Sequence, residues 1–370
     1  MAPTEILAEQ HYRTCAPLYK QLGLETALLT GRVKGSNRQN LLAALQNGEI
    51  HLLIGTHALL QPDVVFNNLG LVVTDEQHRF GVGQRAALQE KGPVPHTLVM
   101  SATPIPRTMA LTLYGDMDVS VIRHLPPGRQ PIITAIRSGQ AAREKVYRFL
   151  LTEVAAGRQG YVVCPLVEES EKLSAQSATE VFQELTSSLL QNIRCGLLHG
   201  RMSAADKEAI MQDFAEGRIS VLIATTVIEV GINVPKATMM IIENAERFGL
   251  AQLHQLRGRV GRGADRSYCV LLHDAGNAVA PERLKVLAET GDGFIVAEKD
   301  LLLRGPGQFL GYRQHGLPEM KMANLADDLH VLEEARQAGL MVMNTPALSS
   351  AIMPLLQQRF NSFFGVLFAG

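Results

Sequence analysis

The sequence predicts an α/β protein with parallel sheets, and two observations carry this. Short apolar runs recur along the chain, at 50–56, 69–76, 96–103, 160–166, 193–200, 219–226, 237–244 and 267–273. Amphipathic helical patterns, such as SNRQNLLAALQNG (36–48) and AADKEAIMQDFAEG (204–217), separate these runs. Short buried strands that alternate with helices are typical of a parallel sheet covered on both faces. The 370 residues leave room for two such domains and a small third.

The domain boundaries follow from where the alternation stops. Three prolines and a glycine fall within 123–131 and cannot continue a helix or a central strand, so we place an interdomain linker there. Beyond residue 275 the strand pattern ends, and 281–316 reads as two helices followed by a loop rich in glycine and proline. The predicted domains are 1–125, 126–275, a hairpin and loop unit at 276–345, and a helical tail at 346–370.

The composition excludes several classes of protein. Hydrophobic residues make up 46% of the chain, but no apolar stretch approaches the length of a membrane span. The four cysteines are scattered, which favours reduced thiols over zinc ligands or disulfides, and no leader opens the chain, so we expect a cytoplasmic protein. The net charge of −1 does not predict a partner, yet two basic stretches, 31–38 and 257–266, are candidates for nucleic-acid contact or are simply solvated loops.

An acidic pair, Asp75 and Glu76, ends the apolar run at 69–76. In open α/β sheets, ligands collect beyond the carboxyl ends of the strands. An aspartate there can hold Mg²⁺, and a neighbouring glutamate can orient the water that attacks a γ-phosphate. The alternative is a helix N-cap with a favourable charge, which is the usual explanation for an isolated pair.

A hydroxyl pair, Ser101 and Thr103, follows the next apolar run, in SATPIPRT. It could bond the acidic pair and couple its state to a second domain. Taken alone, such a triplet is usually only a polar turn.

The second half of the chain offers a matching set of cationic residues. Residues 221–235 run from a strand through Thr225 and Thr226 to Gly231 and Asn233, where an asparagine could touch a ribose or a catalytic water. Farther on, QLHQLRGRVGRG places three polar side chains at i, i+4 and i+7, which share one face of a helix: Gln255, Arg259 and Arg262. Arginines from a second domain can stabilise transition-state charge on a phosphate. The alternative is a solvated basic helix, although each internal glycine would cost it about 1 kcal/mol.

The order PTEILAEQH, DEQH, SATPIPRT, ATTVIEVGINVP, QLRGRVGR resembles superfamily 2 helicases, and DEQHRFGVGQR with MMIIENAERFGLAQLHQLRGRVGRG resembles the RecG type. The resemblance implies two RecA-like domains that close over ATP and Mg²⁺, with sequence-independent binding of branched or forked DNA and no membrane. It leaves room for contact with single-strand-binding protein in the parent protein. By resemblance, the DNA-binding residues are Thr4, Gly31, Thr56, Thr225 and Thr226. The translocation residues, in a segment similar to the family's helical hairpin and loop, are Arg283, Arg304, Arg313 and Gln314.

One expected part is missing from the sequence. Superfamily 2 motors bind the β- and γ-phosphates with G-x-x-x-x-G-K-[ST], and this chain has no Gly-Lys dipeptide. We therefore expect a first domain truncated at its N-terminus, little ATPase activity from the chain alone, and a first sheet left loose by the loss of an internal strand. Two alternatives stay open: a non-catalytic fragment that binds nucleic acid or a partner, and a transcription-repair coupling translocase, which typically has a second glutamate in place of Gln77.

Overall fold

The structure is a computed structural model, and it describes residues 1–102, 118, 120–122, 129–165, 171–225, 234–274, 276, 280–304 and 329–367. The chain divides into two compact units. The first unit comprises 1–103 and 126–291, and the second comprises 104–125 and 292–370. The described strands all lie in the first unit, and every pairing among them is parallel. The predicted α/β class with parallel sheets is confirmed.

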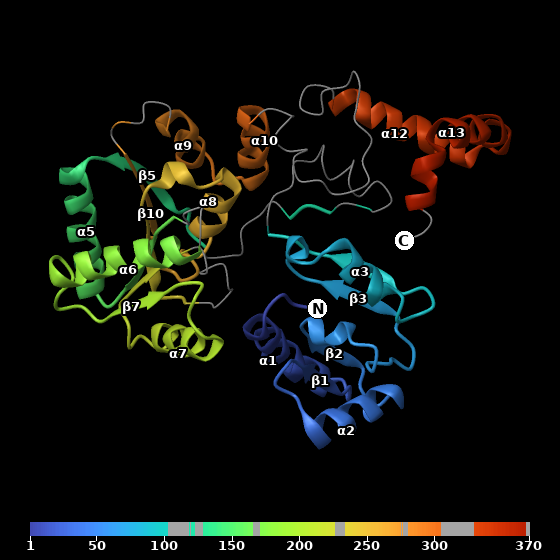
Figure 1. Cartoon of the computed structure of the whole chain (residues 1–370), viewed down its shortest axis with the longest axis horizontal. Helices are drawn as coiled ribbons and strands as arrows, with labels where there is room; N and C mark the ends of the chain where they lie inside the picture. The colour runs from blue at the N-terminus through green and yellow to red at the C-terminus, as the bar shows by residue number, and fades with distance from the viewer. Residues whose placement is uncertain are drawn as a thin grey trace. The chain divides into compact units, whose positions relative to one another are not determined.

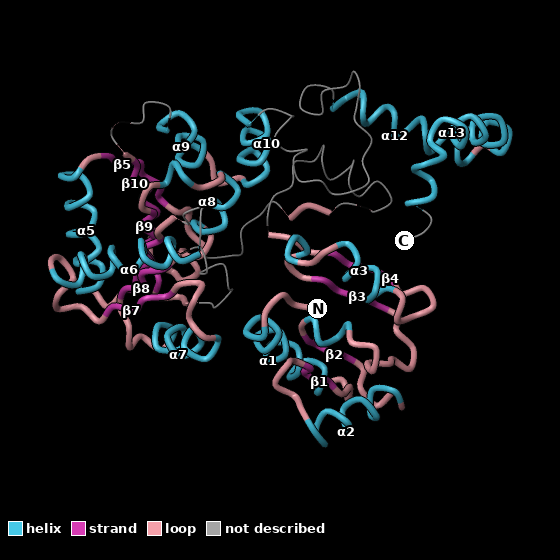
Figure 2. Tube along the Cα trace, in the orientation of Figure 1, coloured by secondary structure: helices cyan, strands magenta, loops and turns pink. Residues whose placement is uncertain are grey.

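The amino-terminal part of the first unit contains two separate pairs of strands (Figures 1 and 2). One sheet pairs β1 with β2, and the other pairs β3 with β4. The elements, in chain order, are α1 (Glu5–Gln21), β1 (Thr26–Leu29), α2 (Gly35–Gln46), β2 (Leu52–Gly55), η1 (His57–Leu60), β3 (Leu71–Thr74), η2 (Gln77–Arg79), α3 (Val82–Gln89) and β4 (His96–Val99).

Apolar side chains join these two small sheets on one face only. One buried cluster contains Leu29 of β1, Val72 of β3 and Leu88 of α3, so a single core runs under both pairs. On another face, Ala8 of α1 packs with Ile54 of β2 in a smaller cluster to which β3 and β4 contribute nothing.

The carboxyl-terminal part of the first unit is a six-stranded sheet in the order β5-β10-β9-β6-β8-β7. Its elements are β5 (Ile133–Ser138), α5 (Gln140–Ala155), β6 (Gln159–Val163), α6 (Glu171–Ser187), β7 (Cys195–Leu198), α7 (Ala204–Ala215), β8 (Val221–Ala224), β9 (Ala237–Ile242), η4 (Ala245–Arg247), α8 (Leu250–Arg257), β10 (Tyr268–His273) and α9 (Ala280–Glu289).

Helices cover both faces of this sheet. On one face, Leu150 of α5 and Leu185 of α6 pack against Val162 of β6. On the other face, the ring of Phe214 in α7 lies 4.8 Å from the ring of Tyr161, whose side chain alternates with that of Val162 along β6. Of the four inner strands, β6, β8 and β9 are buried along their whole length, as continuous apolar runs predict.

The second unit contributes three described helices, namely α10 (Gly293–Arg304), α12 (Leu329–Asn344) and α13 (Pro346–Leu367). In the described part of the chain, no single helix is long and apolar enough to cross a membrane. One sharply bent pair, 337–344 with 346–356, meets the length and composition requirement only when both helices are taken together.

All eight strands expected from the apolar runs are present, and so are the two helices expected within 281–316. Two strands were not predicted, β1 and β5. Both are edge strands of their sheets and only partly buried, so neither carries the continuous apolar run by which the other strands were recognised.

Candidate nucleotide and nucleic-acid site

The acidic pair lies where predicted, at the carboxyl end of β3. Oδ2 of Asp75 is 2.9 Å from Nε2 of His11 in α1, and its Oδ1 accepts a hydrogen bond from the backbone N–H of Glu76. The backbone N–H of Asp75 donates to the carbonyl oxygen of Met1. The Asp75 side chain remains 23% exposed. The carboxylate is thus held in place and still accessible to a ligand.

Glu76 has a left-handed backbone, with φ of +50°. This conformation is uncommon for a residue with a side chain, and it is concentrated at functional sites. Glu76 stands at the N-cap position of η2, but its side chain makes no capping hydrogen bond there. The capping alternative therefore does not explain the Glu76 side chain.

The donor chemistry at Asp75 fits a nucleotide-bound Mg²⁺. This ion usually keeps several waters and takes one or two carboxylates together with substrate phosphates. Within the residues that the structure describes, no group of three or more His, Cys, Asp or Glu side chains could hold a metal ion. An ion at Asp75 would complete its shell with waters and phosphate oxygens, as a metal that arrives with a nucleotide does.

Two buried threonine hydroxyls lie at strand ends. Thr56 follows β2 and Thr225 follows β8, and each residue is 1% exposed. Among the residues that the structure describes, neither hydroxyl has a hydrogen-bond partner. Leaving a buried polar group unpaired costs about 1–3 kcal/mol. A phosphate could reach these hydroxyls only after the groups that cover them move. Thr4 has a local role, because its hydroxyl accepts from the backbone N–H of Leu7 as the N-cap of α1.

The two halves of the first unit repeat one pattern. Gly31, Gly48 and Thr56 recur 169 positions later as Gly200, Gly217 and Thr225. LLTGR at 28–32 becomes LLHGR at 197–201, and Gly48 and Gly217 both have φ of +80°. The sequence interpretation singled out Gly31 but missed its counterparts in the second half, His199, Gly200 and Arg201. This internal repeat is the signal that would have found them.

A second block repeats at the acidic pair. TDEQHRFG at 74–81 becomes IENAERFG at 242–249, so that Glu243 takes the place of Asp75 and Asn244 that of Glu76. Asn244 has φ of +48°, and each block continues into a short 3-10 helix and then a helix capped by glycine. Glu243, unlike Asp75, is buried.

Partners on α5 hold one carboxylate oxygen of Glu243. Its Oε1 accepts hydrogen bonds from Nε of Arg143 at 2.8 Å and from the hydroxyl of Tyr147 at 2.6 Å. Arg143 also pairs with Glu184 of α6. Burial and the neighbouring charge of Glu243 raise the pKa of Tyr147 well above its ordinary value. In the second repeat the strand-end carboxylate therefore holds helices against the sheet.

One expectation about the arginines is wrong. Gln255, Arg259 and Arg262 do not share a helix face, because α8 ends at Arg257. Gly258 caps the helix, and Gly261 then takes φ of +73°, which no continuing helix allows. Sequence spacing alone could not separate this turn from a longer helix.

The arginines are nevertheless desolvated. Burial lowers the pKa of Arg259, and the negative charge of Glu76 opposes this by raising it. Burial also lowers the pKa of Arg262, as do the neighbouring positive charges of Arg259 and Arg129. The first unit thus brings Arg259 within electrostatic reach of the acidic pair.

Other predicted residues have local contacts or lie beyond the description. Arg283 of α9 donates to the carbonyl oxygens of Glu246 and Phe248. Gly31 is exposed in the loop after β1, and Ser101 is exposed after β4. Arg304 is the last residue of α10. Arg257, which was not predicted, is buried and donates to the carbonyls of Leu287 and Thr290, which ties α8 to α9. The remaining predicted residues lie outside the described residues: Thr103, Thr226, Gly231, Asn233, Arg313 and Gln314.

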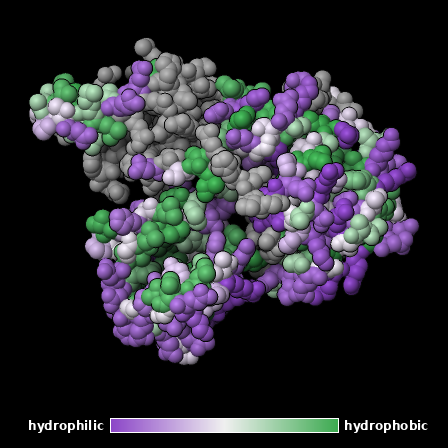
Figure 3. Space-filling model, turned by 180° about the vertical axis from the view of Figure 1, so that it is seen from behind, coloured by the Kyte–Doolittle hydropathy of each residue, from purple (hydrophilic) through white to green (hydrophobic). Residues whose placement is uncertain are grey.

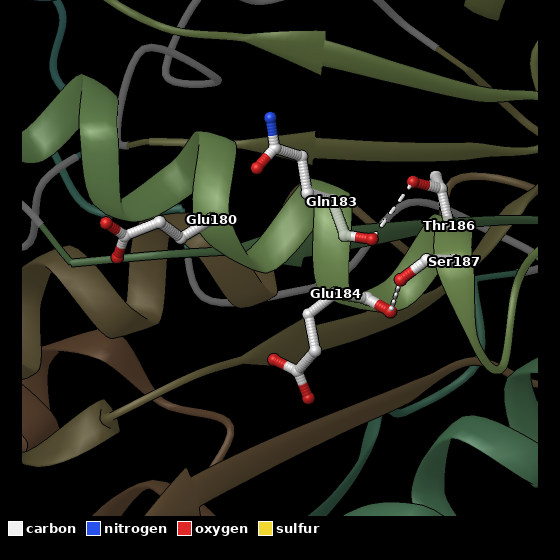
Figure 4. A pocket seen from close by; sticks show the side chains of 5 residues that line it. All are labelled: Glu180, Gln183, Glu184, Thr186 and Ser187. Atoms are coloured by element: carbon white, nitrogen blue, oxygen red, sulfur yellow. Dashed lines mark hydrogen bonds between the residues drawn. The ribbon is translucent and has the colours of Figure 1, made fainter.

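A surface depression of about 580 Å³ lies along α6, away from these residues (Figure 4). Its lining side chains all come from that one helix, and the hydroxyls of Thr186 and Ser187 donate to carbonyl oxygens of the same helix. The depression carries no chemistry that competes with the strand ends.

Comparison with known protein families gives three matches along the chain. The family described as DEAD/DEAH box helicase matches residues 1–112. The helicase conserved C-terminal domain matches 141–264. The C-terminal part of domain 3 of ATP-dependent DNA helicase RecG matches 290–363.

Individual relatives agree with these matches. An ATP-dependent DNA helicase RecG of Synechocystis sp. is 51% identical over 99% of this chain and 44% of its own length. That of Thermotoga maritima is 52% identical over 91% and 43%. The chain spans about half the length of the curated relatives it matches.

Solved structures give the same assignment. A structure of RecG bound to a three-way DNA junction aligns with a TM-score of 0.72 at 48% identity, over 90% of this chain and 43% of that one. Saccharomyces cerevisiae Dbp5 bound to RNA and ADP BeF3 aligns with a TM-score of 0.55 over 91% and 80%, and at 16% identity it shows the fold alone.

Proposed function

This chain belongs to the RecG type of DNA helicases, and we propose that it is the motor portion of an enzyme that uses ATP to remodel branched DNA. The observation that carries the proposal is identity of about one half over an alignment that covers 99% of the chain and therefore spans the acidic and arginine blocks. A relative of known structure binds a three-way DNA junction. We infer the same class of substrate here, with branch migration and fork regression as the outcome.

In the proposed nucleotide step, Asp75 would hold a nucleotide-bound Mg²⁺, and Glu76 orients the attacking water. The ion would supply positive charge against the negative charge that develops on the phosphate. Arg259 and Arg262 stabilise that charge from the other half of the first unit. Gln255, Gly231 and Asn233 are the further residues that we assign to the nucleotide. The electrostatic influence of Glu76 on Arg259 supports this pairing. Ser101 and Thr103 relay the state of the acidic pair.

The DNA step uses the strand-end loops of both halves. Gly31 and Gly200 follow equivalent strands, and small residues there allow a phosphate to approach the backbone N–H groups. Contacts of this kind carry no sequence information, so binding should be independent of sequence and weaken with salt. Arg283, Arg304, Arg313 and Gln314 would convert closure into movement along the duplex.

An ATPase assay tests the nucleotide step. The chain of 370 residues carries no phosphate-binding G-x-x-x-x-G-K-[ST] segment, so we expect little DNA-stimulated phosphate release from it alone. In the full-length parent protein, Arg259→Ala should lower kcat by about 10³-fold or more, as for other arginines that stabilise phosphoryl transfer. Arg266→Ala, which changes an exposed arginine in the same basic stretch, is the control. A parent protein that tolerates Arg259→Ala contradicts the proposal.

A second assay tests the threonines. Thr56→Val and Thr225→Val remove a hydroxyl that has no protein partner, so stability should be unchanged or slightly raised. If DNA uses these hydroxyls, binding should weaken by about tenfold, since one hydrogen bond contributes roughly 1–1.5 kcal/mol. Thr152→Val is the matched control, because the Thr152 hydroxyl is bonded within α5. Unchanged affinity for DNA in both variants would show that these hydroxyls do not contact the DNA.

The remaining partners follow from the family. We propose that the parent protein contacts single-strand-binding protein, since an enzyme that acts on forked DNA meets single-stranded segments there. Buried thiols at Cys164 and Cys269 are consistent with the reducing cytoplasm.

A further inference from the structure

One side chain of α1 reaches the acidic pair. Nε2 of His11 lies 2.9 Å from Oδ2 of Asp75, although the two residues are 64 positions apart in the sequence. An ionised carboxylate only accepts hydrogen bonds, so the imidazole donates here. The other oxygen of Asp75 accepts from the backbone N–H of Glu76, also at 2.9 Å. Each oxygen thus accepts from one described donor, and the two donors together set the plane of the carboxylate.

These donors leave room for a ligand on Asp75. Its side chain is 23% exposed, and an ionised carboxylate has about four lone-pair positions. An ion binds more tightly to a carboxylate that already faces it, because binding then does not have to restrict the side chain. Removal of a hydrogen bond to a ligating carboxylate commonly lowers metal affinity by about 10–100-fold. His11 is therefore placed to set how tightly Asp75 holds an ion.

The same helix also contacts the loop that follows β1. Oε2 of Glu5 lies 3.0 Å from Nε of Arg32, and Oε1 of Glu9 lies 3.8 Å from Nη1 of the same arginine. Glu5 also packs closely against Gly31, since a Cβ added to that glycine would lie 3.3 Å from Oε1 of Glu5. A ligand that moves the loop at Gly31 and Arg32 therefore changes the contacts of α1.

The helix α1 lies between that loop and the acidic pair. Successive residues of an α-helix are rotated by about 100°, so His11 lies about 200° around the axis from Glu9. Glu9 and His11 thus point to nearly opposite sides of α1. Ala8 is fully buried and packs with Ile54 of β2, which seats the helix on the sheet. Rigid elements with contacts at both sides can carry coupling between two sites.

We propose that α1 couples the loop at Gly31 to the acidic pair, with His11 as the positioning residue that orients Asp75 toward its metal ion. The inference deepens the proposed function and rests on it, since it takes DNA at Gly31 and an ion at Asp75. A DNA phosphate at Gly31 draws the guanidinium of Arg32 away from Glu5 and Glu9. The helix then shifts, and His11 carries the shift to the carboxylate. By linkage, DNA and the ion change each other's affinity by the same factor.

The positioning role is tested first in the chain of 370 residues, without metal or nucleotide. His11→Leu removes the donor, whereas His11→Gln keeps an N–H the same number of bonds from the backbone as Nε2 of histidine. Without the donor the carboxylate of Asp75 is free to rotate. The amide of Glu76, which donates to that carboxylate, should then exchange with solvent at least about fivefold faster in His11→Leu, and His11→Gln should restore slow exchange.

A matched variant controls for the added leucine. Gln10 is exposed and precedes His11 in α1, so Gln10→Leu adds the same apolar side chain to the same helix. Apolar residues already gather on the surface of the amino-terminal part (Figure 3), and Leu18 of α1 is 58% exposed. Gln10→Leu should therefore leave the exchange of the Glu76 amide unchanged. Equal exchange in His11→Leu and Gln10→Leu would overturn the positioning role.

The coupling is tested in the full-length parent protein, with Mn²⁺ and ADP as the probe and the dissociation constant of Mn²⁺ as the readout. His11→Leu should weaken Mn²⁺ binding by about tenfold, and His11→Gln should restore it to within about threefold. Forked DNA should tighten Mn²⁺ binding to the unaltered protein by at least about fivefold and should have no effect on His11→Leu.

Two results would overturn the coupling: Mn²⁺ affinity that DNA leaves unchanged in the unaltered protein, or a DNA effect of the same size in His11→Leu. Either result, in a parent protein that hydrolyses ATP on DNA, would refute this inference and leave the proposed function intact. A parent protein without DNA-stimulated ATPase activity would contradict the proposed function itself.

Discussion

In a protein made of these 370 residues alone, the amino group of Met1 should make the stability of the amino-terminal part depend on pH. Burial lowers its pKa from 8.0 to about 6, and the charge of Asp75 opposes this shift only partly. Between pH 6 and 8 the unfolded chain therefore binds a proton that the folded chain excludes. Stability should rise as the pH rises through this window, by up to about 2.7 kcal/mol, since each pKa unit is worth about 1.36 kcal/mol.

The measurement compares the chain with Met1 retained and the same chain acetylated at its amino group. Acetylation removes the charge and keeps one N–H to donate to the carbonyl of Val73. Opening free energies of the β3–β4 ladder, from exchange of the Val72 and Thr74 amides, report on this part of the chain alone. The free amine should gain about 1–3 kcal/mol from pH 6 to 8 relative to the acetylated chain. Parallel pH profiles for the two proteins would refute the reasoning, because all other titrating groups are common to both.

Two further predictions concern stability. Glu243→Gln removes the charge that pairs with the partly buried Arg143 and should cost about 1.5–3 kcal/mol in urea unfolding, as for hydrogen bonds to charged groups. Glu144→Gln, in an exposed pair on the same helix, should change stability by less than about 0.5 kcal/mol, and similar effects of both would contradict the structural role. Gly55→Ala should destabilise the β1–β2 sheet severely, because an added Cβ would lie 2.2 Å from a backbone oxygen. Gly70→Ala should be tolerated, because the space around Gly70 is open. Thermal unfolding of the two variants measures the difference.

The sequence predicted what depends on pattern and missed what depends on local backbone. Continuous apolar runs identified eight strands because buried parallel strands need them. The arginine spacing suggested one helix face, yet Gly258 and Gly261 end α8 first. The acidic pair was placed correctly, but its anchoring by His11 joins residues 64 positions apart. Periodicity carries no information about such a contact, and the same holds for the pairing of Met1 with β3.

The repeat within the first unit explains why one strand-end acid is the better candidate for chemistry. Both copies have the same backbone conformation, in which an acidic residue is followed by a residue with positive φ and then by a short 3-10 helix. In the second copy, Arg143 and Tyr147 both bind Oε1 of Glu243, so a metal ion would compete there with a cation that is already paired. In the first copy, the carboxylate of Asp75 bonds, among the described residues, a neighbouring imidazole and a backbone N–H, and its side chain stays 23% exposed. The proposed nucleotide therefore belongs at Asp75, and the Glu243 cluster serves to hold α5 and α6 on the sheet that presents Arg259.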